Sequence, residues 1–371
     1  MNKRLIAIAV AGALALPAAA TAGVEIYGKA RMSLDFVSND DPTLVDGEGS
    51  AKENEDSAMS VTSNASRLGF KGSEDLGGGL SAIWQIENSV DMDNGGIEND
   101  RNTFLGLTGD WGTALAGRHD TPYKMSTGKL DIFVDTRADY NGAKTDVETD
   151  GGVEALSGPM RLDVRSDNAI AYVSPDMSGF SFAAAYVTDY KNDDLPQVKD
   201  KDNSAVSVMG AYNNGPFFVT LAYESLSELG FEKTSASKPD DIEGTKLGAS
   251  YTLFDATTFG FIYEKVDYGN KMDQDGFYLN VAHKISDVTL KAAVGQLDEF
   301  GCGDGCKDTG GSYYALGVSK DMSKNTELYA LYTAADADKN NDVAGINNVA
   351  GYADKTTSAF SVGINHNFSS K

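Results

Sequence analysis

The sequence predicts an all-β protein, a closed 16-stranded antiparallel β-barrel that crosses a membrane. Apolar and polar residues alternate with a period of two along most of the chain, whereas helical periodicity is nearly absent. Seven short turns alternate with eight long polar loops, which divides the chain into 16 strands. After residue 22, no stretch is long and apolar enough to form a membrane helix.

The amino terminus has the composition of a secretory signal peptide. Lys3 and Arg4 precede an apolar run from Leu5 to Leu16, and Ala20-Thr21-Ala22 forms a small-residue cleavage site. A membrane anchor is the alternative, but the run is shorter than the ~20 apolar residues that span a bilayer. We therefore expect residues 1–22 to be removed on export and residues 23–371 to form one domain, the barrel.

The first predicted strand, residues 24–36, separates two faces. One face is apolar and consists of Val24, Ile26, Gly28, Ala30, Met32, Leu34 and Phe36. The other is largely polar or charged and consists of Glu25, Tyr27, Lys29, Arg31, Ser33 and Asp35. The same alternation recurs in residues 216–224, 246–253, 288–295 and 360–368. Each segment is therefore predicted to be a strand with one apolar and one water-facing side.

Short and long connections alternate between the strands. The short ones lie near 75–79, 109–112, 174–179, 213–216, 253–257, 285–287 and 321–325. The long ones lie near 38–57, 91–100, 119–167, 190–203, 227–243, 268–275, 298–312 and 335–357. A soluble two-sheet protein needs no such difference between its ends, whereas bacterial outer-membrane barrels have short periplasmic turns and long outer loops. Because lipid cannot hydrogen-bond free backbone groups, spanning strands must close into a ring.

Composition and strand number bound the function. The chain carries 31 Lys and Arg against 55 Asp and Glu, and this net charge of −24 repels phosphates and argues against a partner nucleic acid. The sequence contains neither a nucleophile elbow nor an HExxH zinc motif, so we do not expect an enzyme. Sixteen strands enclose a water-filled channel, whereas about eight leave an interior that side chains fill.

Several segments resemble the Gram-negative general porin family. They are Val24-Glu25-Ile26-Tyr27-Gly28, the block SRLGFKGSEDLGGGL from Ser66 to Leu80, the block NTFLGLTGDWGTALAGRHDTPYK from Asn102 to Lys124, and GINHNF from Gly363 to Phe368. The resemblance covers essentially the whole chain after residue 22. It implies a homotrimeric, 16-stranded passive channel in the outer membrane, which passes ions and small hydrophilic solutes.

In porin-like barrels the third long loop folds inward and narrows the channel, and residues 119–167 are the third long loop. Its segment from Lys129 to Tyr140 would place three carboxylates on one face if it were helical, namely Asp131, Asp135 and Asp139. Opposite them we expect basic side chains from the wet faces of early strands, namely Lys29, Arg31, Arg67, Lys71, Arg101 and Arg118. Facing rows of opposite charge set a transverse field across the water column. The alternative is a solvated loop that these basic residues support by ion pairs.

The other long loops hold most of the excess carboxylates. The first loop alone contains Asp40, Asp41, Glu48, Glu53, Glu55 and Asp56. At the cell surface such clusters can share divalent cations with anionic lipopolysaccharide, and they can attract cations to the pore mouth, which predicts modest cation selectivity. The alternative is that they only keep the loops soluble.

Two further motifs remain. Asp336-x-Asp338-x-Asn340, followed by Asp342, resembles the start of a calcium loop but lacks its glycine and its final glutamate, so only loose Ca²⁺ binding and no cofactor is expected. Cys302 and Cys306 are the only cysteines, and an oxidising compartment favours a local disulfide between them. No histidine lies near them in sequence, so no metal site is predicted.

The predicted function is therefore a passive, water-filled porin for small hydrophilic solutes. A channel that prefers one substrate is the first alternative. An adhesin or structural outer-membrane barrel, whose loops are the function, is the second, and it predicts no stepwise conductance.

Overall fold

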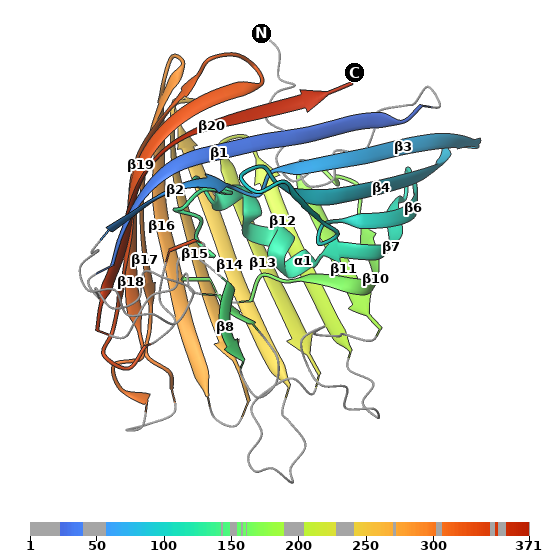
Figure 1. Ribbon diagram of the computed structural model, residues 1–371. Helices are drawn as coiled ribbons and strands as arrows, with labels where there is room; N and C mark the ends of the chain where they lie inside the picture. The colour runs from blue at the N-terminus through green and yellow to red at the C-terminus, as the bar shows by residue number, and fades with distance from the viewer. Residues whose placement is uncertain are drawn as a thin grey trace.

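The computed structural model describes residues 23–39, 57–141, 144–148, 154–156, 159–160, 162–188, 204–227, 241–269, 272–301, 306–341, 346–347 and 354–370. Its main sheet consists of the segments β1 (Glu25–Asn39), β2 (Ser57–Ser63), β3 (Arg67–Gly77), β4 (Leu80–Asp91), β5 (Gly96–Glu98), β6 (Thr103–Gly109), β7 (Gly112–Asp120), β10 (Arg165–Val173), β11 (Phe180–Val187), β12 (Ala205–Asn214), β13 (Phe217–Leu226), β14 (Ile242–Leu253), β15 (Thr257–Asp267), β16 (Asp273–Ile285), β17 (Val288–Leu297), β18 (Gly311–Asp321), β19 (Thr326–Ala337) and β20 (Thr356–Ser369). Each segment pairs with its neighbours in antiparallel register, and the sheet curves into a barrel (Figure 1). The first and last strands close it, in a register that runs from Tyr27↔Ser369 to Asn39↔Thr357.

The barrel has 16 strands, as predicted. The sheet contains 18 segments, but β2 and β3 both pair with β1 and form one interrupted strand, and β5 and β6 both pair with β4 in the same way. The first interruption lies at Asn64–Ser66, where Ala65 has a left-handed backbone (φ 50°) and the amide of Asn64 donates to the carbonyl of Arg31 (3.0 Å).

Neighbouring residues differ sharply in exposure, which confirms the predicted two-faced strands. In β13, Tyr223 is 38% exposed and Glu224 is fully buried. In β14, Leu247 is 39% exposed and Lys246 is fully buried. The apolar side chains therefore point out of the barrel, where lipid can cover them, and the charged side chains point into it.

The connections also follow the prediction. All seven short turns lie where the sequence places them, and β1 begins and β20 ends at the same end of the barrel as these turns (Figure 1). The strand ends that the long loops join lie at the other end. The second one contains the short segment β5, and the third, residues 121–164, contains most of the structure outside the barrel wall.

The third long loop begins with a short helix. Helix α1 (Pro122–Thr127) starts with Pro122, and the hydroxyl of Thr121 caps it by accepting from the amide of Lys124 (3.4 Å). The 3-10 turn η1 (Gly128–Leu130) follows, and β8 (Lys144–Glu148) pairs with β9 (Glu154–Leu156) farther along. No helix among the described residues is long and apolar enough to cross a membrane.

Residues 131–141 form turns rather than the helix that the spacing of the three aspartates would have required. The carboxylate of Asp131 accepts from the amide of Phe133 (2.8 Å), and that of Asp139 accepts from the amides of Asp135 (2.9 Å) and Asn141 (3.0 Å). Such bonds offer the backbone an alternative to the helix. Asp135 itself has a left-handed backbone (φ 56°).

Apolar side chains of the third long loop pack against the inward face of the barrel wall. One buried cluster joins loop residues, such as Leu130 and Phe133, to wall residues of β12, β13, β15, β16, β17, β18 and β19, such as Tyr278 and Tyr313. The amide of Asn280 in β16 donates to the carbonyl of Leu130 (2.9 Å). These contacts hold the loop backbone against strands on the opposite side of the barrel from β7.

Candidate functional site

The centre of the candidate site is the carboxylate of Asp135. Arg67 donates from Nη2 to Asp135 Oδ2 (2.6 Å), and Arg31 donates from Nη1 to the same oxygen. The two arginines come from the adjacent strands β3 and β1, and all three side chains are less than one fifth exposed. Burial by itself would raise the pKa of Asp135, but the charges of Arg67 and Arg31 outweigh it and hold that pKa below its usual range.

A second ion pair lies beside the first. Arg101 donates from Nε to Glu87 Oε1 (2.6 Å), and the hydroxyl of Tyr27 donates to Glu87 Oε2 (2.8 Å). Lys29 is the direct cross-strand partner of Arg67 and makes no ion pair with any described residue. Four cations, Lys29, Arg31, Arg67 and Arg101, thus gather around two carboxylates, Asp135 and Glu87.

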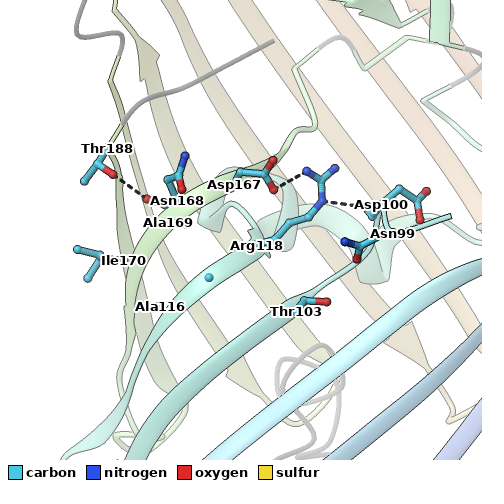
Figure 2. A pocket seen from close by; sticks show the side chains of 11 residues that line it. Asn99, Asp100, Thr103, Ala116, Arg118, Asp167, Asn168, Ala169, Ile170 and Thr188 are labelled. Atoms are coloured by element: carbon cyan, nitrogen blue, oxygen red, sulfur yellow. Dashed lines mark hydrogen bonds and ion pairs between the residues drawn. The ribbon is translucent and has the colours of Figure 1, made fainter. Parts of the chain in front are cut away.

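Two of the basic residues expected here lie elsewhere. Lys71 lies nearer the short-turn end, where its ammonium is 3.6 Å from Glu25 and 4.9 Å from the ring centre of Tyr27. Arg118 is on the outward face of β7 (Figure 2), which it shares with Ala116, the direct partner of the 65% exposed Leu105, whereas Leu115 is 3% exposed and points inward. The expectation that Arg118 faces the water column was therefore wrong.

Asp131 and Asp139 are close to Asp135 but do not face the arginines. Their carboxylates are turned into the loop, where they accept backbone amides. Burial, followed by the charge of Asp139, raises the pKa of Asp131 well above its usual range, and burial raises the pKa of Asp139 to about 6. The structure therefore replaces the expected row of three carboxylates with one, Asp135.

Buried ion pairs fix the third long loop at both sides, and sequence reasoning did not assign them. Lys246 in β14 pairs with Asp163 of the loop and lies 3.3 Å from Glu264 in β15, with all three side chains at most 1% exposed. The hydroxyl of Tyr123 in α1 donates to Glu264 (2.9 Å). The only signal in the sequence is that Lys246 and Glu264 lie on the inward parity of their strands.

On the other side, Arg137 of the loop donates from Nε to Asp35 in β1 (2.8 Å), whose side chain is fully buried. Arg137 also donates to the carbonyl of Asn347 (2.9 Å) and the hydroxyl of Thr62 (2.8 Å). The backbone that carries Asp135 is thus held from both flanks.

The remaining candidates stay predictions. Cys302 lies outside the described residues, so its bridge to Cys306 is not seen here, although Cys306 is disulfide-bonded. The acidic residues 40–56 of the first loop lie outside them too, as does Asp342 of the calcium-like motif. Within the described ranges, no group of three or more His, Cys, Asp or Glu is arranged to hold a metal ion.

Comparison with known proteins identifies the family. The profile of the Gram-negative porins matches residues 7–341, most of the chain. This chain belongs to the Gram-negative porin family. It is therefore an outer-membrane protein.

Individual porins support the assignment. The chain is 30% identical to the major outer membrane protein P.IA of Neisseria meningitidis serogroup C, over 60% of this chain and 60% of that protein's length. It is 27% identical to an outer membrane porin protein of Bordetella pertussis, over 99% and 100% of the two chains. The fold matches the solved anion-selective porin from Comamonas acidovorans with a TM-score of 0.72 at 22% identity, covering 94% and 100%. A trimer form of OmpT from Vibrio cholerae matches with a TM-score of 0.61 at 19% identity, covering 94% and 100%.

Proposed function

We propose that the protein is a passive diffusion channel for ions and small hydrophilic solutes, narrowed by residues 131–139 of the third long loop. The observation that carries the proposal is the double ion pair between Asp135 and the guanidinium groups of Arg31 and Arg67. It fixes a loop carboxylate against the inward face of the wall and leaves charge at the narrow point. A passing solute then meets a fixed field there.

The charges at this constriction favour anions. Four cations around Asp135 and Glu87 leave an excess of two positive charges, and the carboxylate of Asp139, although turned into the loop, offsets part of this excess once it is ionised. In water, one charge at a distance of ~10 Å changes an ion's energy by about 0.4 kcal/mol, roughly a twofold change in its local concentration. The acidic outer loops attract cations. The cation selectivity expected from composition therefore opposes the anion selectivity of the constriction.

Reversal potentials in a salt gradient test both statements. Purified protein in a planar bilayer should give stepwise conductance. The sign of its reversal potential should show that chloride is more permeable than potassium. The double variant Arg31→Gln/Arg67→Gln removes two charges and should lower the chloride-to-potassium permeability ratio by about tenfold or more. Lys320→Gln, which removes an exposed charge beside a short turn, is the matched control and should not change the ratio.

The alternatives give different results. A preference for potassium in the wild type would show that the outer loops set selectivity. Saturable block of the current by one solute would indicate a substrate-preferring channel. The absence of stepwise conductance would favour an adhesin or structural barrel, and hydrolysis of lipid or peptide by non-conducting protein would favour an enzyme.

We further propose that the channel is a homotrimer, for which a porin of the same fold, solved in a trimer form, is the support. Loose Ca²⁺ binding by the acidic outer loops is a separate proposal. Sedimentation of the detergent-solubilised protein measures the number of subunits. Calorimetric titration with calcium measures the binding of Ca²⁺.

A further inference from the structure

Residues 346–347 of the eighth long loop lie inside the barrel. This loop joins β19 to β20, at the same end of the barrel as the other long loops. Ile346 is fully buried and packs against Ala335, Ala359 and Val37, which belong to β19, β20 and β1. The segment is therefore seated on the inward face of the wall, at the seam that closes the barrel.

Asn347 makes three hydrogen bonds with the two residues that follow Asp135 in the third long loop. Its side-chain amide donates from Nδ2 to the carbonyl of Thr136 (2.8 Å), and its backbone amide donates to the carbonyl of Arg137 (3.2 Å). Arg137 in turn donates from Nη1 to the carbonyl of Asn347 (2.9 Å). Two loops whose contacting residues are 210 positions apart in the sequence are thus joined beside the constriction carboxylate.

The carbonyl of Thr136 also closes the turn that follows Asp135, because it accepts from the backbone amide of Asp139 (3.1 Å). Asp135 has a left-handed backbone (φ 56°), a conformation that persists only where surrounding contacts fix it. The bond from Asn347 is one of these contacts, and it acts on the very next residue. Asn347 therefore helps to hold the backbone that aims the Asp135 carboxylate at the two arginines.

We propose that Asn347 is a positioning residue for ion selectivity, through which the eighth long loop sets where the Asp135 carboxylate lies. The proposal rests on the channel function proposed above. Without the bond from Asn347 the turn loosens, the carboxylate leaves Arg31 and Arg67 for part of the time, and their positive charge is then exposed to passing ions.

Reversal potentials of Asn347→Ala in a salt gradient test the proposal. Asn347 has no charge, so a change in the permeability ratio must come from charged groups that it positions. The chloride-to-potassium ratio should rise by about twofold, part of the way to the value for Asp135→Asn. In the Asp135→Asn background, the same substitution should leave the ratio unchanged, because the carboxylate that Asn347 positions is gone.

Asn341→Ala is the matched control. Asn341 is also a buried asparagine of the eighth long loop, with 3% of its surface exposed. Its Nδ2 donates to the carbonyl of Gly310 in the seventh long loop (2.7 Å), not to the third. The substitution removes an equivalent hydrogen bond, and the permeability ratio should stay at the wild-type value.

Hydrogen exchange of residues 131–141, followed by mass spectrometry, is a second readout and does not require conductance. The backbone amides of this segment that are bonded within the loop should exchange about fivefold faster in Asn347→Ala than in the wild type. Asn341→Ala should not change their rate. Asn347→Leu keeps the size of the side chain and removes only Nδ2, so it should reproduce both results even if the alanine variant does not fold.

The outcomes distinguish the role of Asn347 from the channel function. A wild type that does not conduct would overturn the channel function, and the selectivity role with it. If the wild type conducts and Arg31→Gln/Arg67→Gln lowers its ratio, an unchanged ratio in Asn347→Ala would overturn only the role of Asn347. Faster exchange without a change in the ratio would show that Asn347 stabilises the loop and nothing more. An equal rise of the ratio in the Asp135→Asn background would also contradict the proposal, because the effect would then not depend on Asp135.

Discussion

At the scale of single residues, the constriction depends on a carboxylate that two strands share. Arg31 and Arg67 lie on neighbouring strands and bind the same oxygen of Asp135. Each guanidinium also has a backbone partner, the carbonyl of Val134 (3.4 Å) for Arg31 and that of Ala65 (3.1 Å) for Arg67. The arginines are therefore held in place by more than the ion pair, and their charge can persist when the carboxylate is removed.

Asp135→Asn tests this arrangement. The substitution raises the local positive excess from two charges to three, which raises the chloride and lowers the potassium concentration by about twofold each, so the chloride-to-potassium permeability ratio should rise by about fourfold. Reversal potentials in a salt gradient measure it. Asp131→Asn is the control, because the carboxylate of Asp131 is turned into the loop and its pKa is raised. The permeability ratio of this variant should stay near that of the wild type. A ratio that falls in Asp135→Asn would rule out the proposed role of the carboxylate.

Lys246 tests how the loop is anchored. Lys246→Met keeps the length of the side chain but leaves Asp163 and Glu264 buried without their cation, and breaking such a pair costs about 3–5 kcal/mol. The variant should unfold at lower temperature and show noisier single-channel currents. Lys265→Met removes a pair whose lysine is 49% exposed, and there the cost should be at most about 1 kcal/mol. Heat unfolding followed by circular dichroism compares the two, and equal losses would contradict the anchoring role.

At the scale of elements, two groups of the third long loop titrate near neutral pH. Burial raises the pKa of Asp139 to about 6, although its carboxylate accepts hydrogen bonds from two backbone amides, which lower that pKa. Burial lowers the pKa of Lys129 to about 7, and its ammonium lies 3.0 Å from the ring centre of Phe218. An acid with a raised pKa is neutral below that pH and charged above it, and an amine with a lowered pKa loses its charge above it. Both changes make the loop more negative as pH rises.

The chloride-to-potassium permeability ratio should therefore fall as pH rises from 5 to 8. Reversal potentials at fixed salt gradient and stepped pH measure the fall. Asp139→Asn should remove the part of this fall in the permeability ratio that is centred near pH 6, and Lys129→Gln should remove the part that is centred near pH 7. The arginines stay charged throughout. A ratio that is constant with pH, or that rises, would show that neither group senses the channel.

The same element shows where sequence reasoning succeeds and where it fails. Strand alternation placed Arg31, Arg67 and Arg101 on the inward face, because a period of two needs no knowledge of the partner strand. It failed for Arg118, because β7 has small or apolar residues on both faces, with Leu115 inward and Ala116 outward, so its sequence does not show which face is wet. A spacing of four also could not reveal which aspartate meets the arginines, because local amide bonds decide whether the segment is a helix or a series of turns.

At the scale of the whole molecule, the seam between β1 and β20 decides whether a barrel exists at all. An open sheet would leave two strands with unpaired backbone groups in lipid. The neighbouring pairing of β19 and β20 supports the seam from inside, where the ring of Tyr329 lies over Gly363, its direct partner. Tyr329 is 7% exposed, and the side-chain amide of Asn64, beside β1, donates from Nδ2 to its hydroxyl oxygen (3.5 Å). This tyrosine thus packs across the closure.

Gly363→Val tests this contact. A Cβ at Gly363 would lie 2.2 Å from the ring of Tyr329, so the ring must leave its position and the inner packing of the seam is lost. Overpacking of this kind costs about 1–3 kcal/mol, and the unfolding temperature should fall. Gly210→Val is the matched control, since a Cβ there meets no atom within 4 Å and β12 is far from the seam. Heat unfolding of the refolded proteins compares them. If Gly363→Val and Gly210→Val unfold at the same temperature, the Tyr329 contact does not stabilise closure, and backbone pairing alone must hold β20 in the barrel.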